Sequence, residues 1–213
     1  MKSKNINKIL IVDFGSQVTQ LIARQVRELG VYCELINFKK FNKFKTFDKN
    51  IKGIILSGGP KSTLSKSAPN IKWKLFLNKL PLLGICYGHQ LISNICGGKT
   101  KYSNKKEFGS VILIEKKKSK LTEGFFTNKK NTVWMSHSDS VMIKPKNFNV
   151  IASSKNSKFA ILELAAAKPL SNNCFISPFN KAISAFDLSK EDFNKFRSLS
   201  NSFLRAAKLL VFC

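Results

Sequence analysis

The sequence contains few of the residues that usually mark a metal site, a disulfide framework or a membrane span. It has two histidines in 213 residues, and its five cysteines form no Cys-x-x-Cys pair. An odd cysteine count without ligand spacing argues against both a disulfide framework and a zinc site. No apolar run approaches the roughly 18 residues that cross a bilayer. We therefore expect no metal site, no structural disulfide and no membrane partner.

Acidic residues are also scarce, since 12 Asp and Glu stand against 37 Lys and Arg and give a formal net charge of +25. Such an excess can indicate nucleic-acid binding. The lysines are spread over the whole chain, however, and mix with Asn, Ile and Phe, which all use AT-rich codons. A biased genome would produce this composition, so we expect no nucleic-acid partner. The polar first residues lack the apolar stretch of a secretion signal, which indicates a cytoplasmic protein.

The sequence does contain apolar strands that alternate with amphipathic helices. The expected strands cover residues 8–12, 31–38, 53–60 and 81–86. Ser16 is expected to cap a helix that ends at Leu29, before Gly30, and a short helix is expected over 73–80. The apolar face expected for the first of these helices consists of Val18, Leu21, Ile22, Val26 and Leu29. This alternation predicts an α/β fold with an open, mostly parallel, twisted sheet flanked by helices.

Beyond Gly98 the pattern favours β structure over 110–117, 132–141, 149–154 and 158–164. Past about Glu163 no clean period remains until a final amphipathic pattern between Phe193 and Ala207. We therefore divide the chain into a first domain over 1–163 and a tail of uncertain fold over 164–213.

Cys86 stands where a predicted strand turns into a predicted helix. Gly84 and Gly88 flank it in the pattern Gly-x-Cys-x-Gly, the cysteine counterpart of the nucleophile elbow. Glycines at these positions let a strained turn pack closely and expose the thiol at a helix N-terminus, where the N–H groups and the helix dipole favour a thiolate. The N–H of Tyr87 is placed to stabilise an oxyanion. An ordinary turn cysteine remains the alternative for this pattern alone.

A glycine pair, Gly58-Gly59, ends the neighbouring predicted strand, and a backbone without side chains can approach a substrate closely. The stretches 13–17, 57–60 and 86–88 all follow strands, and ligands of parallel sheets bind beyond the carboxyl ends of strands. Taken together, the two turns indicate an acyl-transfer site, although a turn that needs positive φ would explain the glycine pair by itself.

Four segments carry a resemblance to a known family. They are ILIVDFGSQVTQLIARQVRELGVYCELI, GIILSGGP, LLGICYGHQL and VWMSHSDSV. These segments closely resemble the class I glutamine amidotransferase domain of GMP synthetases, and the resemblance covers roughly residues 8–163. Gly-x-Cys-x-Gly is common to all class I amidotransferases, whereas the other segments point to the GMP synthetase branch.

The resemblance implies a role for each matching residue. Cys86 would attack the side-chain amide of glutamine, and the N–H groups of Gly59 and Tyr87 would form the oxyanion hole. Gln90 would bind the substrate. The remaining substrate-binding residues implied are Gly58, Ser136, His137, Ser138 and Asp139, which hold the glutamine largely by backbone groups. The family usually has glycine in place of Ser138, and serine would cost about 1 kcal/mol if positive φ were needed there.

The family's catalytic base is missing from this sequence. The resemblance implies a His-Pro-Glu motif after the strand expected at 158–164, yet neither His89 nor His137 is followed by Pro-Glu. We therefore expect the chain to cleave glutamine very slowly or to stall. A shifted reading frame, a degraded gene and a replaced tail remain open as explanations, and the underlying DNA sequence would separate them.

The resemblance also implies a synthetase domain with a Ser-Gly-Gly-x-Asp-Ser loop, which this sequence lacks. Amination of XMP would then need a separate partner, the ATP pyrophosphatase (synthetase) subunit. ATP and magnesium would belong to that partner, so we expect no cofactor in this chain. Three interpretations stay open: an impaired glutaminase of GMP synthesis, a catalytically silent amidotransferase-like partner or regulatory protein, and a basic nucleic-acid-binding protein whose affinity falls steeply with salt.

Overall fold

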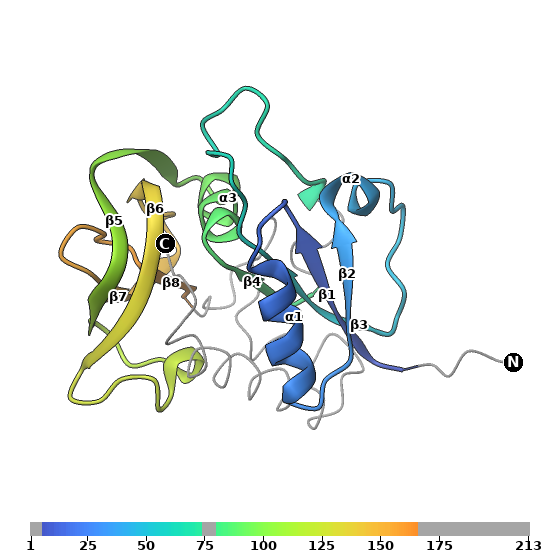
Figure 1. Ribbon diagram of the computed structural model, residues 1–213, viewed down its shortest axis with the longest axis horizontal. Coiled ribbons are helices and arrows are strands. Elements are labelled where there is room, and N and C mark those ends of the chain that lie inside the picture. The colour runs from blue at the N-terminus through green and yellow to red at the C-terminus, as the bar shows by residue number, and fades with distance from the viewer. Residues whose placement is uncertain (1–5, 74–79, 166–213) are drawn as a thin grey trace, which may run out of the picture.

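The computed structural model describes residues 6–73 and 80–165, which form two sheets (Figure 1). Within these residues the first sheet is parallel, in the order β2-β1-β3-β4. Its strands are β1 (Lys8–Asp13), β2 (Cys33–Asn37), β3 (Ile51–Leu56) and β4 (Leu82–Gly84). The second sheet is antiparallel, in the order β6-β5-β7-β8. Its strands are β5 (Lys99–Glu115), β6 (Lys130–Ile143), β7 (Phe148–Ser153) and β8 (Ile161–Leu164).

Three helices accompany the sheets in the described part of the chain: α1 (Thr19–Glu28), α2 (Phe38–Phe41) and α3 (Tyr87–Ile95). Figure 1 shows α3 between the two sheets and α1 on one face of the parallel sheet. The expected α/β fold with a parallel sheet is therefore present. None of the described helices is long and apolar enough to cross a membrane.

The two faces of β1 belong to two separate cores, because successive strand residues point to opposite sides of a sheet. Ile9 and Ile11 pack with α1 and with the inner face of the antiparallel sheet. Leu10 and Val12 pack in the second core with residues of α2 and α3. Burial on both faces explains why this strand is a continuous apolar run.

The first helix differs from the expectation at its start and on its apolar face. It begins at Thr19, and the Ser16 hydroxyl accepts from Val18 N (3.2 Å) instead of capping the helix. Leu21 and Leu29 were expected on the buried face but are 49% and 39% exposed. Thr19 and Ala23 are buried there together with Ile22 and Val26. The helix does stop before Gly30, whose φ of +76° suits glycine.

Other boundaries shift because turn residues were counted into strands. β3 ends at Leu56, before the glycine pair, and β4 covers only Leu82–Gly84. The single turn α2 was not expected, since it is too short for periodicity and begins with Asn37, whose side chain accepts from Lys39 N. The helices expected at 73–80 and 193–207 lie outside the described residues, in whole or, for the first, in all but its ends.

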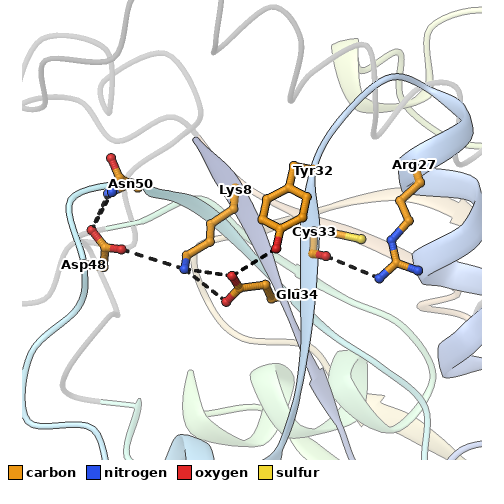
Figure 2. A network of polar contacts seen from close by, with 7 residues as sticks. All are labelled: Lys8, Arg27, Tyr32, Cys33, Glu34, Asp48 and Asn50. Atoms are coloured by element: carbon orange, nitrogen blue, oxygen red, sulfur yellow. Dashed lines mark hydrogen bonds and ion pairs between the residues drawn. The ribbon is translucent and has the colours of Figure 1, made fainter. Parts of the chain in front are cut away.

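A polar network joins the amino-terminal ends of three strands (Figure 2). Lys8 Nζ lies 3.0 Å from a Glu34 carboxylate oxygen and 3.7 Å from Asp48 Oδ2. Asp48 Oδ1 accepts from Asn50 N (3.0 Å), which holds the pKa of this carboxyl below its usual value, and the hydrogen bond to Glu34 raises the pKa of Lys8. This network lies at the edge of the parallel sheet opposite to the carboxyl ends of its strands.

Candidate functional site

A pocket of about 480 Å³ opens at the carboxyl ends of the parallel strands. One wall consists of the segments that follow β1, β3 and β4, and the facing wall comes from β5 and β6. The residues that line it are Gly15, Ser16, Gln17, Val18, Gly58, Gly59, Pro60, Lys61, Ser62, Cys86, Tyr87, Gln90, Phe108, Ser136, His137, Ser138 and Asp139. The three post-strand segments singled out in the sequence therefore meet in one place.

Cys86 adopts a strained backbone conformation between β4 and α3. Its φ of 52° and ψ of −109° are rare for a residue with a side chain, and such strain concentrates at functional positions. A Cβ on Gly84 would lie 2.6 Å from the Gly88 carbonyl, and one on Gly88 would lie 2.6 Å from Leu56 Cβ. Both glycines are thus required by close packing behind the elbow, and neither lines the pocket.

The glycine pair lies against this elbow. A Cβ on Gly58 would be 3.6 Å from Cys86 Cβ, and one on Gly59 would be 3.4 Å from the Tyr87 ring. Within the described residues, no hydrogen bond from the N–H of Gly59 or Tyr87 to another group is present. Two unused amide donors therefore flank the half-buried thiol, as an oxyanion site requires.

A buried hydroxyl network supports the glycine pair from below. The Ser57 hydroxyl donates to the Gly58 carbonyl (3.0 Å) and lies 3.1 Å from Thr19 Oγ1, which donates to Asp13 Oδ1 (2.8 Å). Ser57 and Thr19 are 0% and 2% exposed. The network fixes the start of α1 and the glycine turn to each other. Sequence reasoning missed it because the three residues belong to separate segments.

Tyr87 holds the elbow helix against the long loop that follows β3. Its hydroxyl donates to the Pro69 carbonyl, and its ring packs 5.0 Å from the ring of Phe14. Burial raises the pKa of Tyr87 to about 12, so the phenol stays protonated and continues to donate at neutral pH.

The facing wall is held to the elbow helix by a side-chain amide. Gln90 Nε2 donates to the Asp139 carbonyl (3.1 Å), and His137 Nδ1 lies 3.0 Å from the same oxygen. Asp139 Oδ1 is buried and has no hydrogen-bond partner among the described residues. Ser138 does not have a positive φ, so the strain considered for serine at this position does not arise.

Neither histidine has a ring nitrogen available to the thiol. His137 Nδ1 faces the Asp139 carbonyl, and Nε2 lies 3.2 Å from Glu107 Oε2, an ion-pair distance with bent hydrogen-bond geometry. His89 does not line the pocket, although both of its ring nitrogens are buried. Burial, and secondarily the nearby His137, lowers the pKa of His89 to about 4, so this ring is neutral.

The pocket contains every residue expected to bind or react with substrate, and the two elbow glycines lie behind it. Sequence reasoning missed Phe108 and Lys61 in the lining and Glu107 behind it. Glu107 falls where β5 is irregular, with a register shift between Tyr102 and Glu107, so strand alternation gave no signal for it.

Comparison with known proteins gives a consistent result. The family Glutamine amidotransferase class-I matches residues 10–172. The glutamine-hydrolysing GMP synthase of Agrobacterium fabrum is 48% identical over 157 residues, which cover 73% of this chain and 30% of that protein. The corresponding enzyme of Helicobacter pylori is 46% identical over 156 residues, again 73% and 30%. The chain thus spans about 30% of the length of these curated relatives.

Two crystal structures show the same fold. A GMP synthase subunit of Thermoplasma acidophilum superposes with a TM-score of 0.63 at 24% identity, covering 95% of this chain and 98% of that one. A glutamine amidotransferase of Thermotoga maritima gives 0.62 at 15% identity, with the same coverage. This chain belongs to the class-I glutamine amidotransferase family, through a domain of the kind that GMP synthases carry.

Proposed function

We propose that the pocket binds glutamine and that Cys86 attacks its side-chain amide. The observation that carries this proposal is the strained thiol elbow packed against a glycine turn, with the N–H groups of Gly59 and Tyr87 unused in the described structure. A carbonyl oxygen that becomes negatively charged during attack needs such donors. Gln90 and the 136–139 segment would hold the amino-acid end, where the unpartnered Asp139 carboxylate suits the substrate's ammonium group.

The proposed reaction has two steps. The Cys86 sulfur bonds to the amide carbon, the carbon–nitrogen bond breaks, and ammonia leaves with a proton, so that a glutamyl thioester remains. Water then hydrolyses the thioester to glutamate. The ammonia would serve the amination of XMP by a synthetase that is not part of this sequence. The reaction needs no cofactor in this chain, and a cytoplasmic location is part of the same proposal.

A catalytically silent partner is the second candidate, favoured by the engagement of both ring nitrogens of His137. The sequence has only one other histidine, His89, and its buried ring lies outside the pocket lining. In a serine hydrolase, loss of the histidine costs on the order of a million-fold. Ammonia release at or near background, in the presence of a candidate synthetase, would favour the silent partner over the glutaminase.

The binding and thiol chemistry can be tested separately from turnover. A glutamine-shaped chloroketone is expected to alkylate Cys86 with saturation kinetics, and free glutamine should slow the reaction. Cys86→Ala should abolish this labelling, as measured by peptide mass spectrometry. Cys96→Ala, which removes another half-buried thiol, should leave it unchanged. Labelling that persists in Cys86→Ala, or that glutamine does not slow, would refute the proposal.

A further inference from the structure

A chain of buried polar contacts runs from the antiparallel sheet to the elbow helix. Ser154 Oγ donates to Glu107 Oε1 (2.7 Å), and Glu107 Oε2 lies 3.2 Å from His137 Nε2. His137 Nδ1 lies 3.0 Å from the Asp139 carbonyl, which also accepts from Gln90 Nε2 (3.1 Å). The contacts therefore connect the turn after β7 to α3, across the side of the pocket that the proposed function assigns to the amino-acid end of glutamine.

The groups in this chain are held in one arrangement. A carbonyl oxygen only accepts hydrogen bonds, so Nδ1 of His137 carries a proton and Nε2 is directed to the carboxylate. Glu107 and His137 are 3% and 7% exposed, so water competes little for either group. Burying an ion pair adds little to stability by itself, but removing one partner leaves the other group uncompensated. The pair is therefore better explained by the geometry that it fixes than by stability.

Glu107 is itself anchored from behind. The Ser154 hydroxyl that donates to it accepts from Ser157 N (2.8 Å) and Asn156 N (3.3 Å), within a turn closed by the bond from Ser154 N to the Ser157 carbonyl (2.8 Å). Glu107 also pairs with His137 in the β5–β6 register. Side chain and backbone thus place the carboxylate opposite the imidazole.

We propose that Glu107 is a positioning residue for the amino-acid end of the substrate. It orients His137, and His137 together with Gln90 fixes the Asp139 carbonyl, so that the 136–139 segment keeps its distance from the elbow helix. Glu107 does not line the pocket and does not touch the substrate. This inference rests on the proposed function, because it needs the 136–139 segment to bind glutamine.

The test compares two electrophiles that share a target but differ in shape. A glutamine-shaped chloroketone needs the amino-acid site, whereas iodoacetamide needs only an accessible Cys86. In Glu107→Gln the amide can keep the contact with Ser154 but loses the charge that faces His137. The half-saturating concentration of the chloroketone should rise by about tenfold, as expected for loss of a charge-assisted hydrogen bond. The rate with iodoacetamide should stay unchanged.

Glu163→Gln is the matched control. Glu163 accepts from Ser119 Oγ (2.9 Å) in the same antiparallel sheet but does not line the pocket or take part in the Glu107 chain. Its substitution removes the same charge and leaves a similar serine contact. Both labelling parameters should remain those of the parent protein.

Three results would overturn the inference. A folded Glu107→Gln protein with an unchanged half-saturating concentration would show that the carboxylate is not needed, and an equal loss with both electrophiles would indicate damage to the elbow. If Glu107→Gln fails to fold, Ser154→Ala decides, because it removes only the hydroxyl that orients Glu107, and an unchanged half-saturation would then refute the role. If the parent protein itself shows no saturable labelling, the proposed function fails, which is a distinct outcome.

Discussion

At the scale of single residues, His89 carries an unusual cost. Its two ring nitrogens are buried without a partner among the described residues, although the residue as a whole is half-buried. A polar group buried in this way destabilises a fold by about 1–3 kcal/mol. His89 also shows what a pattern cannot decide, since a histidine three residues after a thiol suggests a base from sequence alone, and only the structure places it outside the pocket.

Replacing His89 with leucine should stabilise the protein and reduce its sensitivity to acid. The unfolded chain takes up a proton on His89 near the ordinary pKa of 6.5, whereas the folded protein does so only at about 4. Stability therefore falls as the pH drops from 6.5 towards 4, since the unfolded state binds the extra proton. Urea unfolding at pH 7 and pH 5 should show a gain of about 1 kcal/mol for His89→Leu at pH 7. An identical loss between the two pH values in variant and parent would contradict this assignment.

At the scale of elements, the turn from β4 into α3 depends on contact between backbones. Gly88 packs on Leu56 of β3, and Gly84 packs on Gly88 and Ile92 of the elbow helix. The strained Cys86 conformation survives because these contacts determine the turn from both sides. A substitution behind the thiol should therefore alter chemistry as well as stability.

Two glycine substitutions should separate these effects. In Gly88→Ala the new methyl group would lie 2.6 Å from Leu56 Cβ, and overpacking of this kind costs about 1–3 kcal/mol or more. The shifted elbow should also slow alkylation of Cys86 by iodoacetamide. In Gly97→Ala, where φ is +89° and no atom lies within 4 Å, only backbone strain of about 1–2 kcal/mol is expected. Equal alkylation rates in the two variants, measured in native buffer, would argue against a strained elbow.

Elements with long apolar runs could be predicted from the sequence, and elements defined by contacts could not. The central strand β1 is buried on both faces, and Gly30 ends α1 through its positive φ, so both leave local signals. The start of α1 depends on the bond between Thr19 and Asp13, and α2 is a single turn. For the site, Cys86 has a local pattern, whereas Glu107 acts through partners far along the chain.

At the scale of the whole molecule, the net charge of +25 is dispersed and lacks compensating acids. Among the described residues the ion pairs are few, and Arg24–Glu28 is an exposed pair within one helix turn. Exposed pairs contribute about 1 kcal/mol at most, so repulsion between like charges should dominate. The compact state is then destabilised by its own charge.

Added salt should therefore stabilise the protein. Raising sodium chloride from low concentration to about 0.5 M shortens the Debye length well below 10 Å and screens the repulsion. The thermal midpoint should rise by several degrees in a calorimetric scan. Sucrose of matched osmolality separates screening from solvent exclusion, since it carries no charge. A midpoint that falls with sodium chloride would mean that attractive pairs outweigh repulsion.

The Lys8–Glu34–Asp48 network and the pocket occupy opposite ends of the same strands. The parallel strands that carry this network are thus secured near their first residues and reactive beyond their last. A surface linker or a fluorescent reporter attached ahead of Ile6 would consequently sit on the side remote from Cys86. Immobilised protein should keep its reactive end open to solution, which makes single-molecule or chip-based measurements of thiol chemistry practical.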